Sequence, residues 1–370
     1  MTPALRSAAL LAALGAGWIA AWRLGLREVD ESSAYSFFIT ALLGFGLYAS
    51  TSGIVIEEFR RELRTVVVAV TLGVLAKVVL IFGVMFLVYR QPEHLVFAVA
   101  VAQIDPLSVA AVRAKSKMSD SAKALLAAWA SFDDPITVLL TVYITSFALQ
   151  GGSVGGFGAF TVNFGLNLAL AGGAFLLWLL VRRRRLAVTG RGARLVVHAV
   201  SAVVVVVIGY VAVSFSLLLA LALIGLFFRP DLGKWVDGLA EVGMFAATCA
   251  VGLVLAFEFS WALAGVGAVL GAAAFCAQAV VAWVLTLPQR WRGDRVRLSL
   301  GQQNGLTAII LALLLEPTFP GAIAVVAPAV VMVNLLHALT NGIYDHFQRP
   351  VPRPAVVRGN VNVVSARVGP

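Results

Sequence analysis

The chain has 370 residues, of which 61% are hydrophobic and only 12% are charged. No single soluble core of this length needs so much apolar material, so the composition predicts an all-α polytopic membrane protein. The net charge of +10 does not indicate nucleic-acid binding, because the basic residues fall between apolar segments and not on one domain. The two cysteines, Cys249 and Cys276, lack the spacing of a metal site.

About twelve apolar segments, each adequate for a tilted helix across a bilayer, follow one another along the chain. Only Ser214, Phe215 and Ser216 mark the boundary between the seventh and the eighth. The expected spans are 7–26, 34–56, 65–89, 94–112, 122–148, 159–181, 194–212, 214–228, 238–257, 260–287, 298–315 and 320–343.

The fourth and eleventh spans carry residues that interrupt a helix. In the fourth, Pro106 follows Asp105, and a proline in a helix interior removes a backbone hydrogen bond. In the eleventh, Gly301, Asn304 and Gly305 lie close together. Non-helical backbone at this depth is tolerated only against protein or a water-filled cavity. Interruptions at corresponding places of spans 3–5 and 10–12 predict inverted repeats, which are typical of secondary transporters.

Asp133 and Asp134 follow each other inside the apolar fifth span. A carboxylate in the middle of a membrane costs at least ~2.5–3.5 kcal/mol, so two in succession indicate an ion or proton site. A structural ion pair is the alternative, but no basic residue lies within fifteen positions after the pair. Lys77, near the middle of the third span, is a possible partner unless its long side chain extends toward the membrane surface.

Basic residues concentrate in alternate loops, and the other loops hold only Arg23, Arg27 and Arg90. Such asymmetry predicts that both termini are cytoplasmic. Residues 1–347 would form the membrane domain, and the proline-containing tail 348–370 is expected to be disordered. The basic residues of the predicted inner loops are Arg60, Arg61, Arg64, Arg113, Lys115, Lys117, Lys123, Arg182, Arg183, Arg184, Arg185, Arg191, Arg194, Arg229, Lys234, Arg290, Arg292, Arg295 and Arg297.

Several segments together resemble the bacterial monovalent cation:proton antiporters over nearly the whole chain. Residues 46–64 are similar to that family's glycine-rich helix end and the charged start of its next helix. Residues 102–106 resemble its unwound Thr-Asp-Pro helix, and residues 131–135 its Asp-Asp ion-binding helix. The stretches 209–225 and 301–314 also fit the family pattern.

The resemblance implies a homodimeric sodium/proton exchanger of the bacterial plasma membrane that serves pH homeostasis. Spans 3–5 and 10–12 would form its core, with the discontinuous spans 4 and 11 crossing there, and the other spans would form the scaffold and dimer contacts. Na⁺ or Li⁺ would be exchanged for H⁺ by alternating access, without enzymatic activity or a cofactor. A K⁺/H⁺ antiporter and a sodium-coupled organic-anion symporter stay open as alternatives.

This sequence departs from the family pattern at three positions. Ile104 stands where the family has a threonine, so a hydroxyl ligand is missing, and Ser108 and Gln103 are the candidates to replace it. Gln278 stands at the position of a lysine or arginine, and Trp129 at that of its glutamate partner. Losing both charges leaves no unpaired charge behind.

The expected ion site consists of carboxylates and backbone carbonyls. Hard oxygen ligands suit Na⁺, and the resemblance gives that role to Asp134, with Asp105 as a second carboxylate. Because successive helix residues point about 100° apart, Asp133 is expected to support the site or to bind a second proton. The expected supporting residues are Ser108, Gln103, Asn304, Gln278, Thr137 and Lys77.

Overall fold

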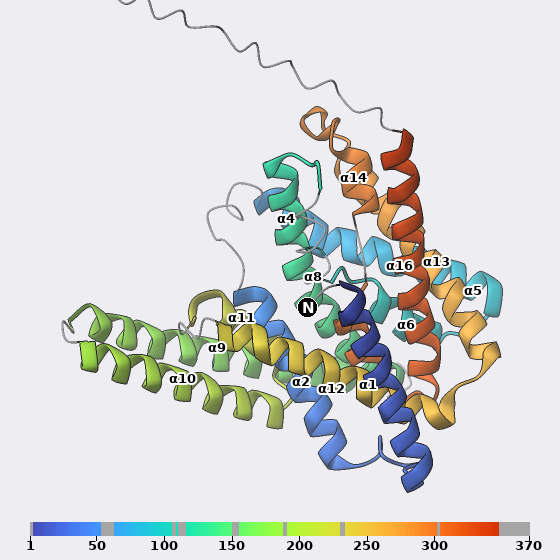
Figure 1. Cartoon of the computed structure of the whole chain (residues 1–370). Helices are drawn as coiled ribbons and strands as arrows, with labels where there is room; N and C mark the ends of the chain where they lie inside the picture. Colours follow the sequence, from blue (N-terminus) through green and yellow to red (C-terminus); the bar gives the residue numbers. More distant parts are fainter. Residues whose placement is uncertain are drawn as a thin grey trace, which may run out of the picture.

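The structure is a computed structural model, shown in Figure 1, and its described elements are helices. It describes residues 3–52, 63–105, 109, 116–149, 155–187, 191–229, 234–301 and 304–347. In chain order the elements are α1 (Pro3–Leu24), α2 (Ser33–Ser52), α4 (Leu63–Val68), the π-helical turn η1 (Ala69–Gly73), α5 (Val74–Tyr89), α6 (His94–Val101), α8 (Asp120–Leu149), α9 (Gly155–Ala187), α10 (Arg191–Ser214), α11 (Leu218–Phe227), α12 (Lys234–Glu258), α13 (Trp261–Leu285), the 3₁₀ turn η2 (Gln289–Trp291), α14 (Arg295–Leu300), α15 (Leu306–Leu315) and α16 (Ala322–Phe347).

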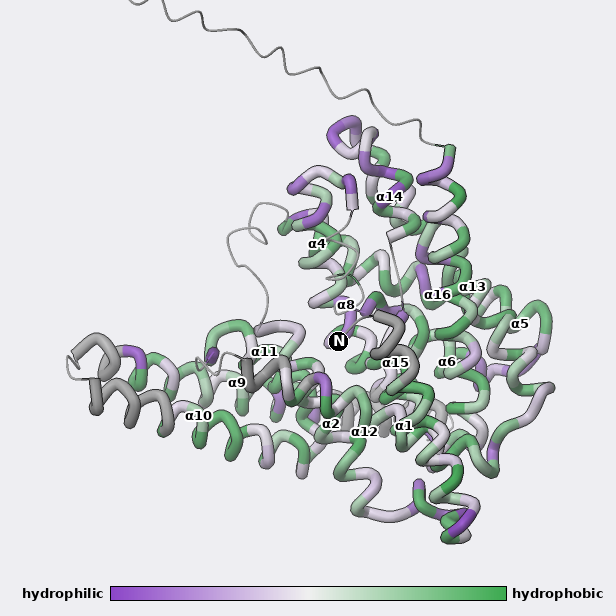
Figure 2. The backbone as a smooth tube through the Cα atoms, viewed as in Figure 1, coloured by the Kyte–Doolittle hydropathy of each residue, from purple (hydrophilic) through white to green (hydrophobic). Residues whose placement is uncertain are grey.

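The all-α membrane architecture predicted from composition is confirmed. Among the described residues, seven helices are long and apolar enough to cross a membrane, and four shorter apolar helices accompany them. Figure 2 shows that hydrophobic residues occur along most of the length of the helices. Apolar side chains such as Val79 and Leu87 are exposed, as a helix in contact with lipid requires. The protein is therefore an integral membrane protein, while the count of twelve crossings stays a prediction.

The predicted interruptions of the fourth and eleventh spans are present. Helix α6 ends at Val101, and the chain up to Asp105 is not helical. In the eleventh span, the break lies between Leu300, where α14 ends, and Leu306, where α15 begins. The crossing of these spans and the inverted repeat stay predictions. Pro106, Ser108 and the tail 348–370 lie outside the described residues.

Loops predicted to lie on the cytoplasmic side contact one another. The backbone N–H and the hydroxyl group of Ser119 donate hydrogen bonds to the Asp294 carboxylate at 3.0 and 2.6 Å. Arg290 donates a hydrogen bond of 2.8 Å to the Thr65 hydroxyl oxygen. These contacts join the regions before α8, after α13 and at the start of α4. Their closeness agrees with the prediction, made from the basic residues, that these regions lie on the same side of the membrane.

The connection between α15 and α16 contains a buried acid, Glu316, which is 1% exposed. Its carboxylate accepts hydrogen bonds from the backbone N–H groups of Gly321 at 2.6 Å and Ile323 at 2.7 Å, at the start of α16. Burial raises the pKa of Glu316 to about 7, the two N–H groups oppose that change, and the charges of Glu258 and Asp30 add to it. All three acids belong to loops or helix ends predicted to lie on the outer side.

Glycines bring three pairs of helices into backbone contact. A Cβ atom on Gly17 of α1 would collide with a backbone carbonyl of α12, and one on Gly252 of α12 with a backbone carbonyl of α1. Gly267 and Gly271 of α13 approach α16 in the same way, and Gly225 of α11 approaches α2. Small residues that permit such close approach are a main source of helix association in membranes.

Candidate functional site

Asp133 forms a buried ion pair with Lys77 of α5. The Lys77 Nζ atom lies 2.6 Å from Asp133 Oδ2, and both side chains are 0% exposed. The same ammonium group lies over the Trp129 ring, 5.7 Å from its centroid. The base that partners the Asp-Asp element therefore comes from the third span, 56 positions earlier in the chain. Of the two carboxylates, only Asp133 has this partner.

Asp134 is also buried, with 1% of its surface exposed, but its surroundings differ. Its Oδ2 atom accepts a hydrogen bond of 2.9 Å from the Thr307 hydroxyl group. Its Oδ1 atom has no hydrogen-bond partner among the residues that the structure describes. Asp105 lies near enough for the two carboxylates to interact electrostatically. Among the described residues, Asp134 thus has one unpartnered oxygen and lies next to a second acid.

Asp105 lies against the start of α15. It is 4% exposed, and a Cβ atom on Gly305 would collide with its carboxyl group, so this approach requires a glycine. Gly305 directly precedes Leu306, the first residue of α15. The N-terminus of a helix carries partial positive charge and stabilises a nearby carboxylate. The interruption of the eleventh span therefore gives Asp105 a favourable position inside the protein.

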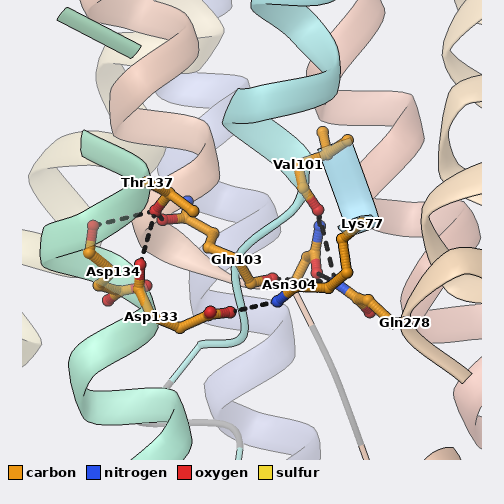
Figure 3. Close-up of polar contacts among 8 residues, drawn as sticks. All are labelled: Lys77, Val101, Gln103, Asp133, Asp134, Thr137, Gln278 and Asn304. Carbon is orange, nitrogen blue, oxygen red and sulfur yellow. Dashed lines mark hydrogen bonds and ion pairs between the residues drawn. The ribbon is translucent and has the colours of Figure 1, made fainter. Parts of the chain in front are cut away.

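Side-chain amides connect the two non-helical segments, as Figure 3 shows. The Gln278 Nε2 group donates hydrogen bonds to the Gln103 backbone carbonyl and to Asn304 Oδ1, both at 3.0 Å. Asn304 in turn donates a hydrogen bond of 2.6 Å to the Val101 carbonyl, and Asn334 donates one of 3.0 Å to the Asn304 carbonyl. These amides satisfy carbonyls that would otherwise lack partners where the helices are interrupted.

Thr137 of α8 lies beside the paired acids. Its hydroxyl oxygen is 2.9 Å from Gln103 Oε1, 3.0 Å from the backbone carbonyl of Asp133 and 2.9 Å from that of Asp134. The Gln103 Nε2 group is buried and has no partner within the described ranges. Among the described residues Gln103 therefore keeps a donor without an acceptor, and Thr137 connects Gln103 to α8.

Proline at position 135 leaves one carbonyl of α8 without its helical partner. Pro135 has no backbone N–H group, so the Ser131 carbonyl one turn earlier cannot form the usual bond. The hydroxyl group of Ser50 in α2 approaches this carbonyl at 3.5 Å. The helix continues through the proline because a neighbouring helix compensates for the lost bond.

Most of the site residues expected from the sequence lie together, and Figure 3 draws all of them except Asp105. Ser108 lies outside the described residues. Thr307 is a residue that sequence reasoning missed, although it stands two positions after the glycine that precedes α15. The residues brought together are Asp133, Asp134, Asp105, Gln103, Asn304, Gln278, Thr137 and Lys77.

Comparison with solved structures shows that this chain is similar to a transporter. No protein-family model matches the sequence, and no curated protein matches it. The structure is similar to that of the sodium proton antiporter MjNhaP1 from Methanocaldococcus jannaschii, with a TM-score of 0.66. The similarity covers 90% of this chain and 92% of the antiporter, at 16% sequence identity. The resemblance seen in the sequence is therefore confirmed at the level of the fold, which is that of a sodium proton antiporter.

Proposed function

We propose that the protein is a secondary active antiporter that exchanges Na⁺ or Li⁺ for H⁺ by alternating access. One observation carries the proposal, namely that the buried Asp134 carboxylate has an oxygen without a described partner and lies near Asp105. Two acids that share a buried site favour binding of a cation or a proton, since either relieves their repulsion. The fold shared with a sodium proton antiporter supports exchange of a cation for protons.

The charges around the site suit competition between two kinds of cation. Asp105, Asp133 and Asp134 are acids, and Lys77 neutralises Asp133 through the buried ion pair. A cation at Asp134 therefore interacts mainly with the charges of Asp134 and Asp105. Backbone carbonyls of the interrupted spans would supply further oxygen ligands, as in transporters whose helices are broken at mid-membrane. Once protons occupy the carboxylates, the attraction for Na⁺ is lost.

The proposed setting is a plasma membrane, with both termini in the cytoplasm and two copies of the chain forming a dimer. The basic loops support this orientation, because positively charged loops are retained on the cytoplasmic side. The contact between Ser119 and Asp294 agrees with it, since both residues belong to predicted inner loops.

Asp134→Asn tests the proposal in proteoliposomes that contain a pH-sensitive dye. Gradients of Na⁺ or Li⁺ should drive proton movement through the unaltered protein, and the variant should abolish it. The amide keeps the side-chain volume but cannot exchange a proton. Glu241→Gln on α12 is the matched control, because Glu241 is an exposed acid and should leave exchange unchanged.

Normal exchange by the Asp134→Asn variant would reject the assignment of Asp134. Size-exclusion profiles and melting temperatures of both variants establish that they are folded. Proton movement driven by K⁺ alone would identify a K⁺/H⁺ antiporter. Na⁺ uptake that requires an organic anion and moves no protons would identify a symporter.

A further inference from the structure

Thr307 joins the helix of the paired acids to the helix that follows the eleventh-span interruption. Its hydroxyl group donates a 2.9 Å hydrogen bond to Asp134 Oδ2, although the two residues are 173 positions apart in sequence. Thr307 is the second residue of α15 and is 9% exposed. It therefore contacts the proposed ion site from the helix opposite Asp134.

The Asp134 carboxylate is only half satisfied by this bond. Its other oxygen, Oδ1, is buried without a hydrogen-bond partner among the described residues. A buried acceptor that lacks a donor is unfavourable, and native proteins rarely leave one without a functional reason. A proton or a cation at Asp134 would remove this deficit. Asp133 Oδ1 also has no described partner, but Lys77 already neutralises that carboxylate. The free oxygen of Asp134 therefore indicates the ligand position, next to the Thr307 contact.

A cation bound to Asp134 can reach the Thr307 hydroxyl oxygen as well. Two oxygens 2.9 Å apart can both lie about 2.4 Å from one ion, a distance usual for oxygen ligands of Ca²⁺, whose radius is close to that of Na⁺. A hydroxyl group has one hydrogen that rotates and two lone pairs. It can donate to ionised Asp134, accept from protonated Asp134, or turn a lone pair toward the cation.

We propose that Thr307 is a ligand of the transported cation, and that it replaces its hydrogen bond to Asp134 with cation coordination in each transport cycle. This inference rests on the proposed antiport function and adds one specific ligand to it. Thr137 is less suited to this role, because its hydroxyl group is already surrounded by three acceptors, the Gln103 side-chain oxygen and the carbonyls of Asp133 and Asp134.

The test compares Thr307→Val, which keeps the shape but removes the hydroxyl group, with Thr307→Ser, which keeps it. Both are measured by equilibrium binding of ²²Na⁺ to purified protein and by Na⁺-driven proton movement in proteoliposomes. We expect Thr307→Val to raise the Na⁺ concentration for half-saturation at least ten-fold, which corresponds to ~1.4 kcal/mol. Thr307→Ser should stay within about three-fold of the unaltered protein, a difference below ~0.7 kcal/mol.

Thr141→Val is the matched control. Thr141 is a buried threonine of α8 whose hydroxyl group donates a hydrogen bond of 2.8 Å to the backbone carbonyl of Thr137, one turn earlier. Its replacement should change Na⁺ binding by less than two-fold. If Thr307→Val does not fold, Thr307→Ala removes the same hydroxyl group with less bulk and is measured in its place.

The outcomes separate this inference from the proposed function. If the unaltered protein exchanges Na⁺ for H⁺ and Thr307→Val binds Na⁺ equally well, Thr307 is not a ligand, while the antiport function stands. Equal damage from Ser and Val would assign Thr307 a packing role and overturn the inference. If the unaltered protein neither binds Na⁺ nor moves protons, both proposals are wrong.

Discussion

The effects on stability of removing Lys77 and of removing Asp133 are expected to be strongly coupled. The charged atoms of this ion pair are 2.6 Å apart and neither side chain is exposed. Lys77→Met leaves a buried carboxylate unpaired, and Asp133→Asn leaves a buried ammonium group unpaired. Breaking such a pair from one side costs ~3–5 kcal/mol, whereas removing both charges together is often close to neutral. We therefore expect the double variant to be more stable than either single variant.

Equilibrium unfolding of the purified protein in mixed micelles measures this cycle. Additive effects would destabilise the double variant by ~6–10 kcal/mol, while the ion pair predicts a loss near ~1 kcal/mol for it. Arg297 and Asp345 form the comparison pair, 3.2 Å apart with side chains 11% and 55% exposed. Removing that pair should show a coupling below ~1 kcal/mol. A double variant as unstable as the sum of its parts would refute the reasoning.

Two further predictions concern Asp105 and Glu316. Asp105→Asn should raise the Na⁺ concentration for half-maximal exchange at least ten-fold, or ~1.4 kcal/mol, because it removes a charge next to Asp134. The proteoliposome assay measures this concentration, and an unchanged value would limit Asp105 to a structural role. Because the folded-state pKa of Glu316 is about 7 against the usual 4.5, its carboxyl group stabilises the protein fully below pH 4.5, and this stabilisation is lost as the pH rises through 7. The difference amounts to ~3 kcal/mol, so melting temperatures should fall between pH 5 and 8.5. Glu316→Gln should make the melting temperature less dependent on pH, and Glu258→Gln should not. If the melting temperature of Glu316→Gln changes with pH as that of the unaltered protein does, Glu316 is not the group that causes the change.

The position of the paired acids could be predicted from sequence, but their partner could not be chosen with certainty. Asp133 and Asp134 are conspicuous because charged groups are costly within an apolar helix. Lys77 is separated from them by 56 positions, and a lysine within a span is equally compatible with a side chain that extends to the membrane surface. Only the packing of α5 against α8 decides which acid the ammonium group meets.

The residue whose hydroxyl group contacts Asp134 also could not be predicted from the sequence. The sequence pointed to Ser108 and Gln103 near the missing threonine, since those residues are close to Asp105 along the chain. Ser108 lies outside the described residues, and the hydroxyl group that the structure places at Asp134 is that of Thr307, from 173 positions away. Threonines in apolar helices commonly bond their own backbone, so the residue type alone does not distinguish this one. The local signal is its position two residues after Gly305, at the start of the helix that follows the interruption.

The helical elements themselves followed well from hydropathy and local chemistry. The weak boundary at Ser214, Phe215 and Ser216 is a turn between α10 and α11, and Ser216 has a positive φ of 54°. The interruptions also lie where glycine and proline indicated them. The contacts that bring α6, α13 and α15 together depend on packing between distant segments, and neither periodicity nor composition encodes them.

The glycine contacts restrict how this molecule can change shape. Where Gly17 and Gly252 place α1 and α12 backbone to backbone, no side chain lies between them that could change its rotamer to permit sliding. The same holds for α13 with α16 at Gly267 and Gly271. Each pair should therefore move as one rigid body. If the protein works by the proposed alternating access, the movement that opens the site to either side of the membrane would take place between these two helix pairs, and a larger residue at Gly267 would separate two helices that need to move together.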